Sequence, residues 1–160
     1  MRPRRIMRTV TVVAMTLGVG TQVRGQGAEP RGAVTFPDAT SVRVEIADTG
    51  AKRQLGLMFR EQLSPSDGMI FVFEEPGYYP FWMKNTLIPL DMIWLDEDAR
   101  VVSIAHAVPP CEADPCPSFP PDPGTSAIYV VEVVAGFARD HGVTRGDRLE
   151  LHDVQAPGRP

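Results

Sequence analysis

Residues Phe81–Met92 read Phe-Trp-Met-Lys-Asn-Thr-Leu-Ile-Pro-Leu-Asp-Met, and they place an ammonium, an amide, a hydroxyl and a carboxylate among large apolar side chains. Asn85 is the only asparagine of the chain. Polar groups in such surroundings either hydrogen-bond one another inside the fold or face a ligand. This stretch is therefore the candidate site of the protein.

The same stretch predicts two strands joined by a tight turn that contains Pro89. In the register we expect, Asn85 lies opposite Asp91, and Trp82 lies opposite Trp94. Because side chains alternate along a strand, the amide and the carboxylate would form a polar pair at the end of an apolar face.

Short strands bounded by turn residues account for most of the chain outside this hairpin. The segments expected as strands are 41–46, 69–73, 81–86, 90–95, 100–107, 127–134 and 147–152. Two short helices are expected, one over 50–59 with Thr49 as its N-cap and one over 137–141. The pattern predicts a mainly β fold, a small antiparallel sandwich or barrel with two short helices.

The two ends of the chain differ in composition from this central domain. Residues 1–25 join an arginine-rich start to a short apolar run, the layout of a cleaved signal peptide, and that run is too short to span a bilayer. Residues 26–40 are expected to be a flexible leader, 41–153 a single β domain, and 154–160 a C-terminal tail. The predicted location is the periplasm or the extracellular space.

Loss of the signal peptide makes the protein more acidic. Residues 1–25 contain five arginines and no acid, so the remainder carries 11 basic and 20 acidic residues and a net charge near −9. Such a surface repels phosphate backbones and anionic lipid, which argues against binding nucleic acid or a membrane surface. About 135 residues suit one domain with one core, and we expect a monomer.

The chain has two cysteines, Cys111 and Cys116, within a segment, 108–126, that holds seven prolines. In an exported protein an even number of closely spaced cysteines favours a disulfide, which would stabilise the fold by about 2 kcal/mol. A metal pair and free thiols are the alternatives. The spacing differs from the Cys-x-x-Cys of oxidoreductases, and no further cysteine could complete a zinc site.

The order of several short motifs resembles domain of unknown function family 192. The segments that carry the resemblance are Gly56–Arg60, Gly68–Phe71, Phe81–Met92, Pro110–Cys111 and Val131–Gly136. The resemblance covers about residues 40–152 and implies a compact, jelly-roll-like β domain that is often exported in bacteria. It carries over no catalytic residues, because the family has no established activity.

Two interpretations of the candidate site remain open. In the structural one, Asn85, Thr86 and Asp91 bond to backbone groups of the turn, and Lys84 lays its stem over an indole. In the functional one, Lys84 attracts an anionic or polyol ligand, Asn85, Thr86 and Asp91 orient it, and Trp82 forms the rim. We favour a periplasmic ligand-binding or accessory module over an enzyme.

Two alternatives belong to other classes of protein. Asp91 and Glu132 could be the acid and base of a hydrolase or lyase that acts on an extracytoplasmic polymer, although Glu132 is expected as a rim carboxylate on an edge strand. A structural module could instead dock a partner through exposed Trp82 or through Tyr78 and Tyr79.

No cofactor or metal is predicted. The three histidines, His106, His141 and His152, have spacings unlike a metal cluster. Four methionines could bind Cu(I) through their thioethers, but they lie in apolar segments where methionine ordinarily fills gaps in the core. They are Met58, Met69, Met83 and Met92.

Overall fold

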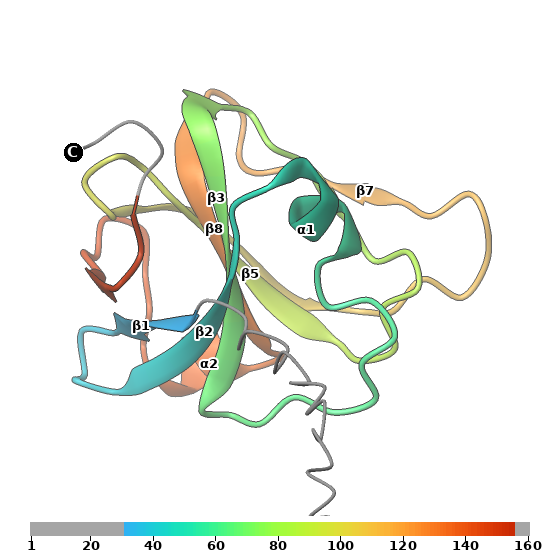
Figure 1. The fold of residues 1–160 in the computed structure, drawn as a ribbon, viewed down its shortest axis with the longest axis horizontal. Helices are drawn as coiled ribbons and strands as arrows, with labels where there is room; N and C mark the ends of the chain where they lie inside the picture. The colour runs from blue at the N-terminus through green and yellow to red at the C-terminus, as the bar shows by residue number, and fades with distance from the viewer. Residues whose placement is uncertain (1–30, 156–160) are drawn as a thin grey trace, which may run out of the picture.

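A curved seven-stranded sheet forms the body of the protein (Figure 1). The computed structural model describes residues 31–155, so the predicted signal peptide and most of the tail lie outside the described residues. The strand order is β6-β5-β8-β3-β2-β1-β9, and a separate two-stranded sheet pairs β4 with β7. The elements are β1 (Arg31–Thr35), β2 (Ser41–Ala47), α1 (Gly50–Leu55), β3 (Asp67–Gly77), β4 (Phe81–Trp82), β5 (Leu90–Leu95), β6 (Val101–Val108), β7 (Ser118–Phe119), β8 (Ala127–Val134), α2 (Phe137–Asp140) and β9 (Glu150–His152).

The sheet curls around a first hydrophobic core until its two edges meet. Side chains from β1, β2, β3, β5, β6 and β8 belong to this one cluster, and α2 contributes Phe137 and Ala138 to it. An isolated bridge between Arg100 and Arg148 joins the chain before β6 to the chain before β9. The prediction of a mainly β, barrel-like fold with two short helices is therefore confirmed.

A second hydrophobic core lies on the opposite face of the central strands. It is built from Met69, Phe71, Met92, Trp94 and Val130 on the sheet, and segments outside the sheet cover them. Because β8 lies between β3 and β5 and packs on both faces, seven of its eight residues are buried. A strand covered on both faces has an apolar sequence without polar alternation. The candidate site lies above this second core.

One pair of strands is parallel, which the antiparallel prediction did not include. β2 pairs with β3 in parallel, and residues 48–66 cross between them by way of α1. A parallel pair requires such a long connection, because the chain must return to the same end of the sheet. Thr49 caps α1 as predicted, since its hydroxyl accepts a hydrogen bond from the Lys52 amide at 3.3 Å.

The predicted hairpin between segments 81–86 and 90–95 is wrong. β4 ends at Trp82 and pairs with β7, whereas β5 pairs with β6 and β8. The chain turns at once after β4, because the Thr86 amide donates to the Met83 carbonyl at 3.1 Å and Asn85 takes a left-handed φ of 55°. β4 lies over the sheet instead of within it, with the Phe81 ring edge-on to Trp94 at 5.9 Å between centroids.

The predicted flexible leader is also folded from Arg31 onward. β1 pairs with β2 and β9, and Val34 and Phe36 are buried in the first core. Gly32 permits this pairing, since a Cβ there would lie 2.6 Å from the His152 carbonyl oxygen. Within residues 31–155, no helix combines the length and the apolar character needed to cross a membrane.

Candidate functional site

The predicted site residues lie in three different places. Trp82, Lys84 and Asn85 line a surface cleft, Thr86 lies in a small chamber beneath it, and Asp91 belongs to the other face of the sheet. The separation follows from the turn after β4, which directs residues 83–88 across the sheet before β5 begins. The Asn85–Asp91 pair expected from the hairpin is therefore not formed.

The surface cleft, which we call the Trp82 cleft, has a volume of about 430 Å³. Its lining residues are Ala51, Gln54, Leu55, Met58, Phe59, Trp82, Lys84 and Asn85. One wall comes from α1 and the turn after it, and the other comes from the turn after β4. The two walls are joined by a hydrogen bond of 2.8 Å from the Phe59 amide to the Asn85 carbonyl. Both of these residues have positive φ, so each wall ends in a tight left-handed bend.

The Trp82 cleft combines exposed aromatic rings with polar groups. Trp82 is 48% exposed and Phe59 is 65% exposed, although aromatic rings of this size are usually covered. The Lys84 ammonium lies 5.7 Å from the centroid of the Trp82 ring and 3.7 Å from a carboxylate oxygen of Asp114. The Asn85 amide nitrogen approaches the Met58 sulfur at 3.9 Å. Lys84 thus lies over the indole, as the structural interpretation expected, and also lines a cleft.

The disulfide loop supports the position of Lys84. Cys111 and Cys116 are bonded to each other as predicted, with their Cα atoms 5.6 Å apart. The Cys111 amide donates to the Met83 carbonyl at 3.4 Å, and Asp114, which pairs with Lys84, lies between the two cysteines. The loop therefore holds the turn after β4 from its outer side.

A carboxyl group lies at the floor of this region. Glu132 occupies the central strand β8, directly between Met69 of β3 and Met92 of β5. Its expected place on an edge strand was wrong, because β8 lies between β3 and β5 inside the sheet. Glu132 is only 4% exposed, and burial raises the pKa of its carboxyl to about 8. Burial is the single cause of this raised pKa, and among residues 31–155 no side chain or amide donates a hydrogen bond to the carboxyl.

The Glu132 carboxyl faces a chamber of about 30 Å³, which we call the Glu132 chamber. Thr86, Met58 and Trp82 are among its lining residues, together with Arg53. Met58 and Trp82 also line the Trp82 cleft, so the chamber lies directly behind the cleft. The Thr86 hydroxyl is buried, and its contact in the structure is a long one of 3.5 Å to the Lys84 carbonyl.

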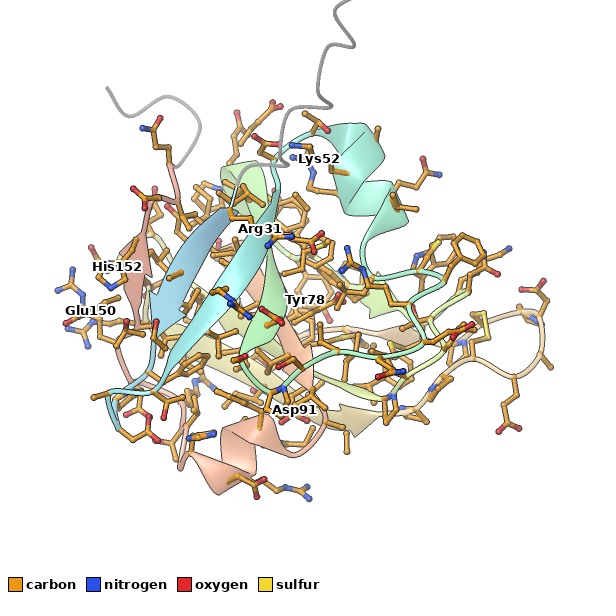
Figure 2. The ribbon with its side chains drawn as sticks, turned by 60° about the horizontal axis from the view of Figure 1, so that its bottom comes forward. Arg31, Lys52, Tyr78, Asp91, Glu150 and His152 are labelled. Carbon is orange, nitrogen blue, oxygen red and sulfur yellow. A yellow bond between two sulfur atoms is a disulfide. The ribbon has the colours of Figure 1, made fainter. Side chains whose placement is uncertain are left out.

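Asp91 has a structural role on the other side of the sheet. Its carboxylate accepts hydrogen bonds from the backbone amides of Ala107 at 2.7 Å, Ala138 at 2.8 Å and Gly136 at 3.1 Å. These contacts join β6 to the start of α2, and Figure 2 shows Asp91 beside that helix. A buried carboxylate with three amide donors is fully engaged. The structural interpretation expected backbone partners in the turn that contains Pro89, whereas the structure places them in β6 and at the start of α2.

The paired carboxylates of the hydrolase alternative are not brought together. Asp91 lies opposite Val133 in the ladder and Glu132 lies opposite Met92, so the two acids point to opposite faces of the sheet. A titratable side chain, that of His106, does lie beside Asp91, and its Nδ1 is 3.9 Å from the Asp91 carboxylate. A dyad that flanks one substrate bond is excluded for Asp91 and Glu132.

Three of the four methionines lie beside Glu132, because Met69 and Met92 flank it in the sheet and Met58 lines the same chamber. Met69, Met83 and Met92 are buried in the second core, and Met58 lines the cleft and the chamber. Across residues 31–155 no three or more His, Cys, Asp or Glu side chains group as ligands for a metal ion.

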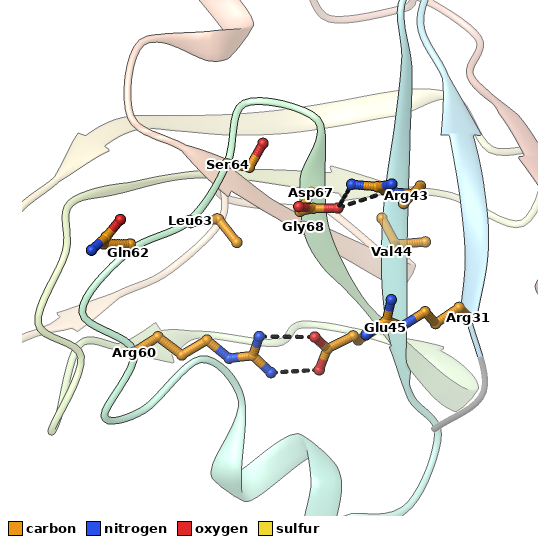
Figure 3. A pocket seen from close by; sticks show the side chains of 10 residues that line it. All are labelled: Arg31, Arg43, Val44, Glu45, Arg60, Gln62, Leu63, Ser64, Asp67 and Gly68. Atoms are coloured by element: carbon orange, nitrogen blue, oxygen red, sulfur yellow. Dashed lines mark hydrogen bonds and ion pairs between the residues drawn. The ribbon is translucent and has the colours of Figure 1, made fainter. Parts of the chain in front are cut away.

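A separate hollow of about 230 Å³ lies beside β2 and was not predicted from the sequence (Figure 3). Arg60 donates two hydrogen bonds to the carboxylate of Glu45, and Arg43 donates to Asp67 at 2.9 Å. Each guanidinium in these pairs already has a carboxylate partner, so the hollow is less suited to a free anion than its arginines suggest.

The wall formed by Gln54, Met58 and Phe59 was not predicted from the sequence. Its one available signal was the Gly56–Arg60 segment, which was used for the resemblance but not for the site. The helix expected over 50–59 ends at Leu55, so Met58 and Phe59 lie in the turn after it, where Phe59 is 65% exposed.

Comparison with known proteins agrees with this architecture. Solved structures similar to the chain include a Sinorhizobium meliloti 1021 protein provisionally named a transcription regulator, at 32% identity and a TM-score of 0.65. The match covers 78% of this chain and 94% of that one. A Novosphingobium aromaticivorans DSM 12444 protein of unknown function is 36% identical with a TM-score of 0.66, over 75% of this chain and 83% of that one.

The chain matches no curated protein. A family model does match it, and the match extends over residues 33–151, which include every element from the middle of β1 to β9. The family is described as an uncharacterized ACR. The resemblance seen in the motifs is thereby confirmed, and the protein belongs to domain of unknown function family 192.

Proposed function

We propose that this protein is an exported ligand-binding module and that its ligand is a polyhydroxylated ring, such as a sugar, held in the Trp82 cleft. The observation that carries the proposal is the half-exposed Trp82 indole, which shares one cleft with the side chains of Lys84, Asn85 and Gln54. Small-molecule sites combine aromatic walls with a few polar groups in this way.

The chemistry of the cleft suits a ring with hydroxyl groups at its edge. The flat face of Trp82 offers apolar contact to the C–H face of such a ring, while amide groups of Gln54 and Asn85 can both donate and accept hydrogen bonds. Lys84 has three N–H donors, and its contact with Asp114 is long at 3.7 Å. Its ammonium would favour a carboxylate substituent on the ring.

Export is part of the proposal and is supported by two features. The layout of residues 1–25 is that of a signal peptide, and the Cys111–Cys116 disulfide persists in an oxidising compartment. The Sinorhizobium relative is provisionally named a transcription regulator, but the acidic surplus of residues 26–160 opposes binding of nucleic acid by this chain.

The test is ligand binding by the mature protein, measured from the indole N–H signals of Trp82 and Trp94 by NMR and from thermal unfolding. Methyl glucoside is the neutral probe and glucuronate is the anionic probe. We expect both to shift the Trp82 signal and raise the Tm, while the buried Trp94 signal stays in place. Trp82→Ala should abolish the rise in Tm.

Two matched variants control for changes in fold and charge. Tyr78→Ala removes another half-exposed aromatic ring, outside the cleft, and should leave binding unchanged. Lys84→Ala should weaken glucuronate about fivefold more than methyl glucoside, whereas Arg145→Ala, which removes a charge from an exposed ion pair, should affect neither. The proposal is refuted if neither probe moves the Trp82 signal.

The exposed apolar side chains favour a second candidate, the docking of a partner protein. Leu55 is 55% exposed and Phe59 is 65% exposed, and both border Trp82 in the cleft. In that case neither sugar would bind, and Leu55→Asp together with Phe59→Ala would release a protein that copurifies from the periplasm with the unaltered chain.

A further inference from the structure

The Glu132 chamber holds a polar group for which the fold gives no partner. Glu132 is more than nine-tenths buried, and its carboxyl has no hydrogen-bond donor in the described part of the chain. Buried polar groups are nearly always hydrogen-bonded, since leaving one unpaired is costly. A carboxyl that faces a chamber instead of a partner therefore indicates that a polar group of a ligand enters the chamber.

The size of the chamber limits what can enter. A volume of about 30 Å³ is enough for one water molecule or one ligand oxygen and too small for a ring. The Trp82 cleft in front of it is more than ten times larger. A ring in the cleft could thus reach inward with a single substituent, past Met58 and Trp82, which line both spaces.

We propose that Glu132 and Thr86 form a subsite for one hydroxyl group of the ligand, in which the neutral Glu132 carboxyl donates a hydrogen bond to the hydroxyl oxygen and the Thr86 hydroxyl accepts a hydrogen bond from the same group. This inference rests on the proposed function, because the hydroxyl belongs to the ring in the Trp82 cleft. A neutral carboxyl is both donor and acceptor, whereas a carboxylate can only accept. An alcohol hydroxyl both donates and accepts at a single oxygen, so it matches this subsite, which has room for one ligand oxygen.

The charged side chains around the chamber have partners other than the Glu132 carboxyl, so none of them favours its ionised form. Arg53 lines the chamber, but its guanidinium donates to the carbonyls of Asp48 at 2.9 Å and Val72 at 2.8 Å. Lys84 is at the rim of the cleft with Asp114.

On the same face of the sheet, two strands away, Arg60 is paired with Glu45. Burial is thus the dominant effect, and the raised pKa of Glu132, about 8, agrees with a protonated group at neutral pH.

The test uses the folded mature protein with 13C at the side-chain carboxyl of glutamate. The Glu132 signal is identified by its loss in Glu132→Gln. Glycerol is the probe for the chamber, since it presents a hydroxyl without needing the indole, and methyl glucoside is the probe for the whole site. We expect glycerol to shift the Glu132 signal saturably at pH 6 and to have no effect on it at pH 10, where the carboxyl is ionised.

Two variants separate the subsite from a general effect of glycerol. Thr86→Val should raise the half-saturating glycerol concentration about fivefold, the loss expected for one hydrogen bond. Thr125→Val is the matched control, because Thr125 is equally buried and lies outside the chamber, and it should leave that concentration unchanged. Glu132→Gln should keep contact with glycerol, seen at the Thr86 methyl signal, and lose its pH dependence.

The outcomes distinguish the subsite from the proposed function. A Glu132 signal that glycerol shifts, while methyl glucoside leaves Trp82 unchanged, supports the subsite and refutes the sugar-binding proposal. A Trp82 signal that methyl glucoside shifts, with Glu132 insensitive to both probes, refutes the subsite and leaves the proposed function standing. A Glu132 signal that titrates with the other glutamates near pH 4.3 refutes the subsite by itself.

Discussion

The substitution Glu132→Gln tests the physical state of the chamber without any ligand. Glutamine has almost the same size and shape as neutral glutamic acid, so the packing between Met69 and Met92 is preserved. The only intended change is that the side chain at position 132 no longer binds and releases a proton. We predict that the difference in unfolding free energy between variant and wild type depends on pH in a defined way.

The sign and size follow from the pKa of Glu132 in the two states. Burial raises this pKa from an ordinary 4.5 to about 8 in the folded protein, so between these values the folded state binds more protons than the unfolded state. The stability contributed by the neutral group is fully present below pH 4.5 and falls as pH rises, by about 1.4 kcal/mol per pH unit. At pH 7 the accumulated loss is about 3 kcal/mol.

The assay is urea denaturation of both proteins at half-unit steps from pH 4.5 to 9. All other titrating groups are shared, so they cancel in the difference between the two proteins. We expect Glu132→Gln to gain stability relative to wild type steadily up to about pH 8, after which the difference becomes constant. The glutamine amide has a desolvation cost of its own, but that cost does not change with pH.

Two results would contradict this reasoning. If the two stability curves run parallel from pH 4.5 to 9, Glu132 has the same pKa folded and unfolded, and the chamber is wet enough to solvate a carboxylate. If the unfolding free energy of wild type rises relative to that of the variant as pH rises, the Glu132 carboxyl is ionised in the folded protein and has a cationic partner.

Three further predictions concern the scaffold and use the same denaturation assay. Asp91→Ala should cost about 3–5 kcal/mol, because three backbone amides lose a buried acceptor, and a loss below about 1 kcal/mol would contradict its anchoring role. The double change Cys111→Ser and Cys116→Ser should cost about 2 kcal/mol, and reductant should then have no further effect on the variant. Arg60→Ala should cost only about 1 kcal/mol, since its pair with Glu45 is partly exposed, and a cost similar to that of Asp91→Ala would show a buried network there.

Local patterns in the sequence predicted where the strands lie in the chain better than they predicted which strands pair with each other. The β-branched run of β8 and the apolar run of β5 appear as strands with the predicted bounds. Thr49 caps its helix, and the two cysteines bond across a short loop. Each of these features is decided by residues within a few positions of one another, so the sequence alone contains the information.

The site itself depended on contacts between distant segments. Asn85 and Asp91 are six residues apart, yet one lines a cleft and the other anchors α2, because the preceding strand pairs with β7 and not with β5. Glu132 is 46 positions from Thr86 in the chain and faces the same chamber. Pairing between strands is chosen by the burial of whole faces, which a local pattern does not record.

The sequence by itself determined the family, the mainly β class, the disulfide and the stretch in which polar groups meet large apolar ones. Only the tertiary structure decided that this stretch divides into a surface cleft, a buried chamber and a structural anchor. The physical reason is that a side chain acquires its surroundings, its exposure and its pKa from elements far away in the chain.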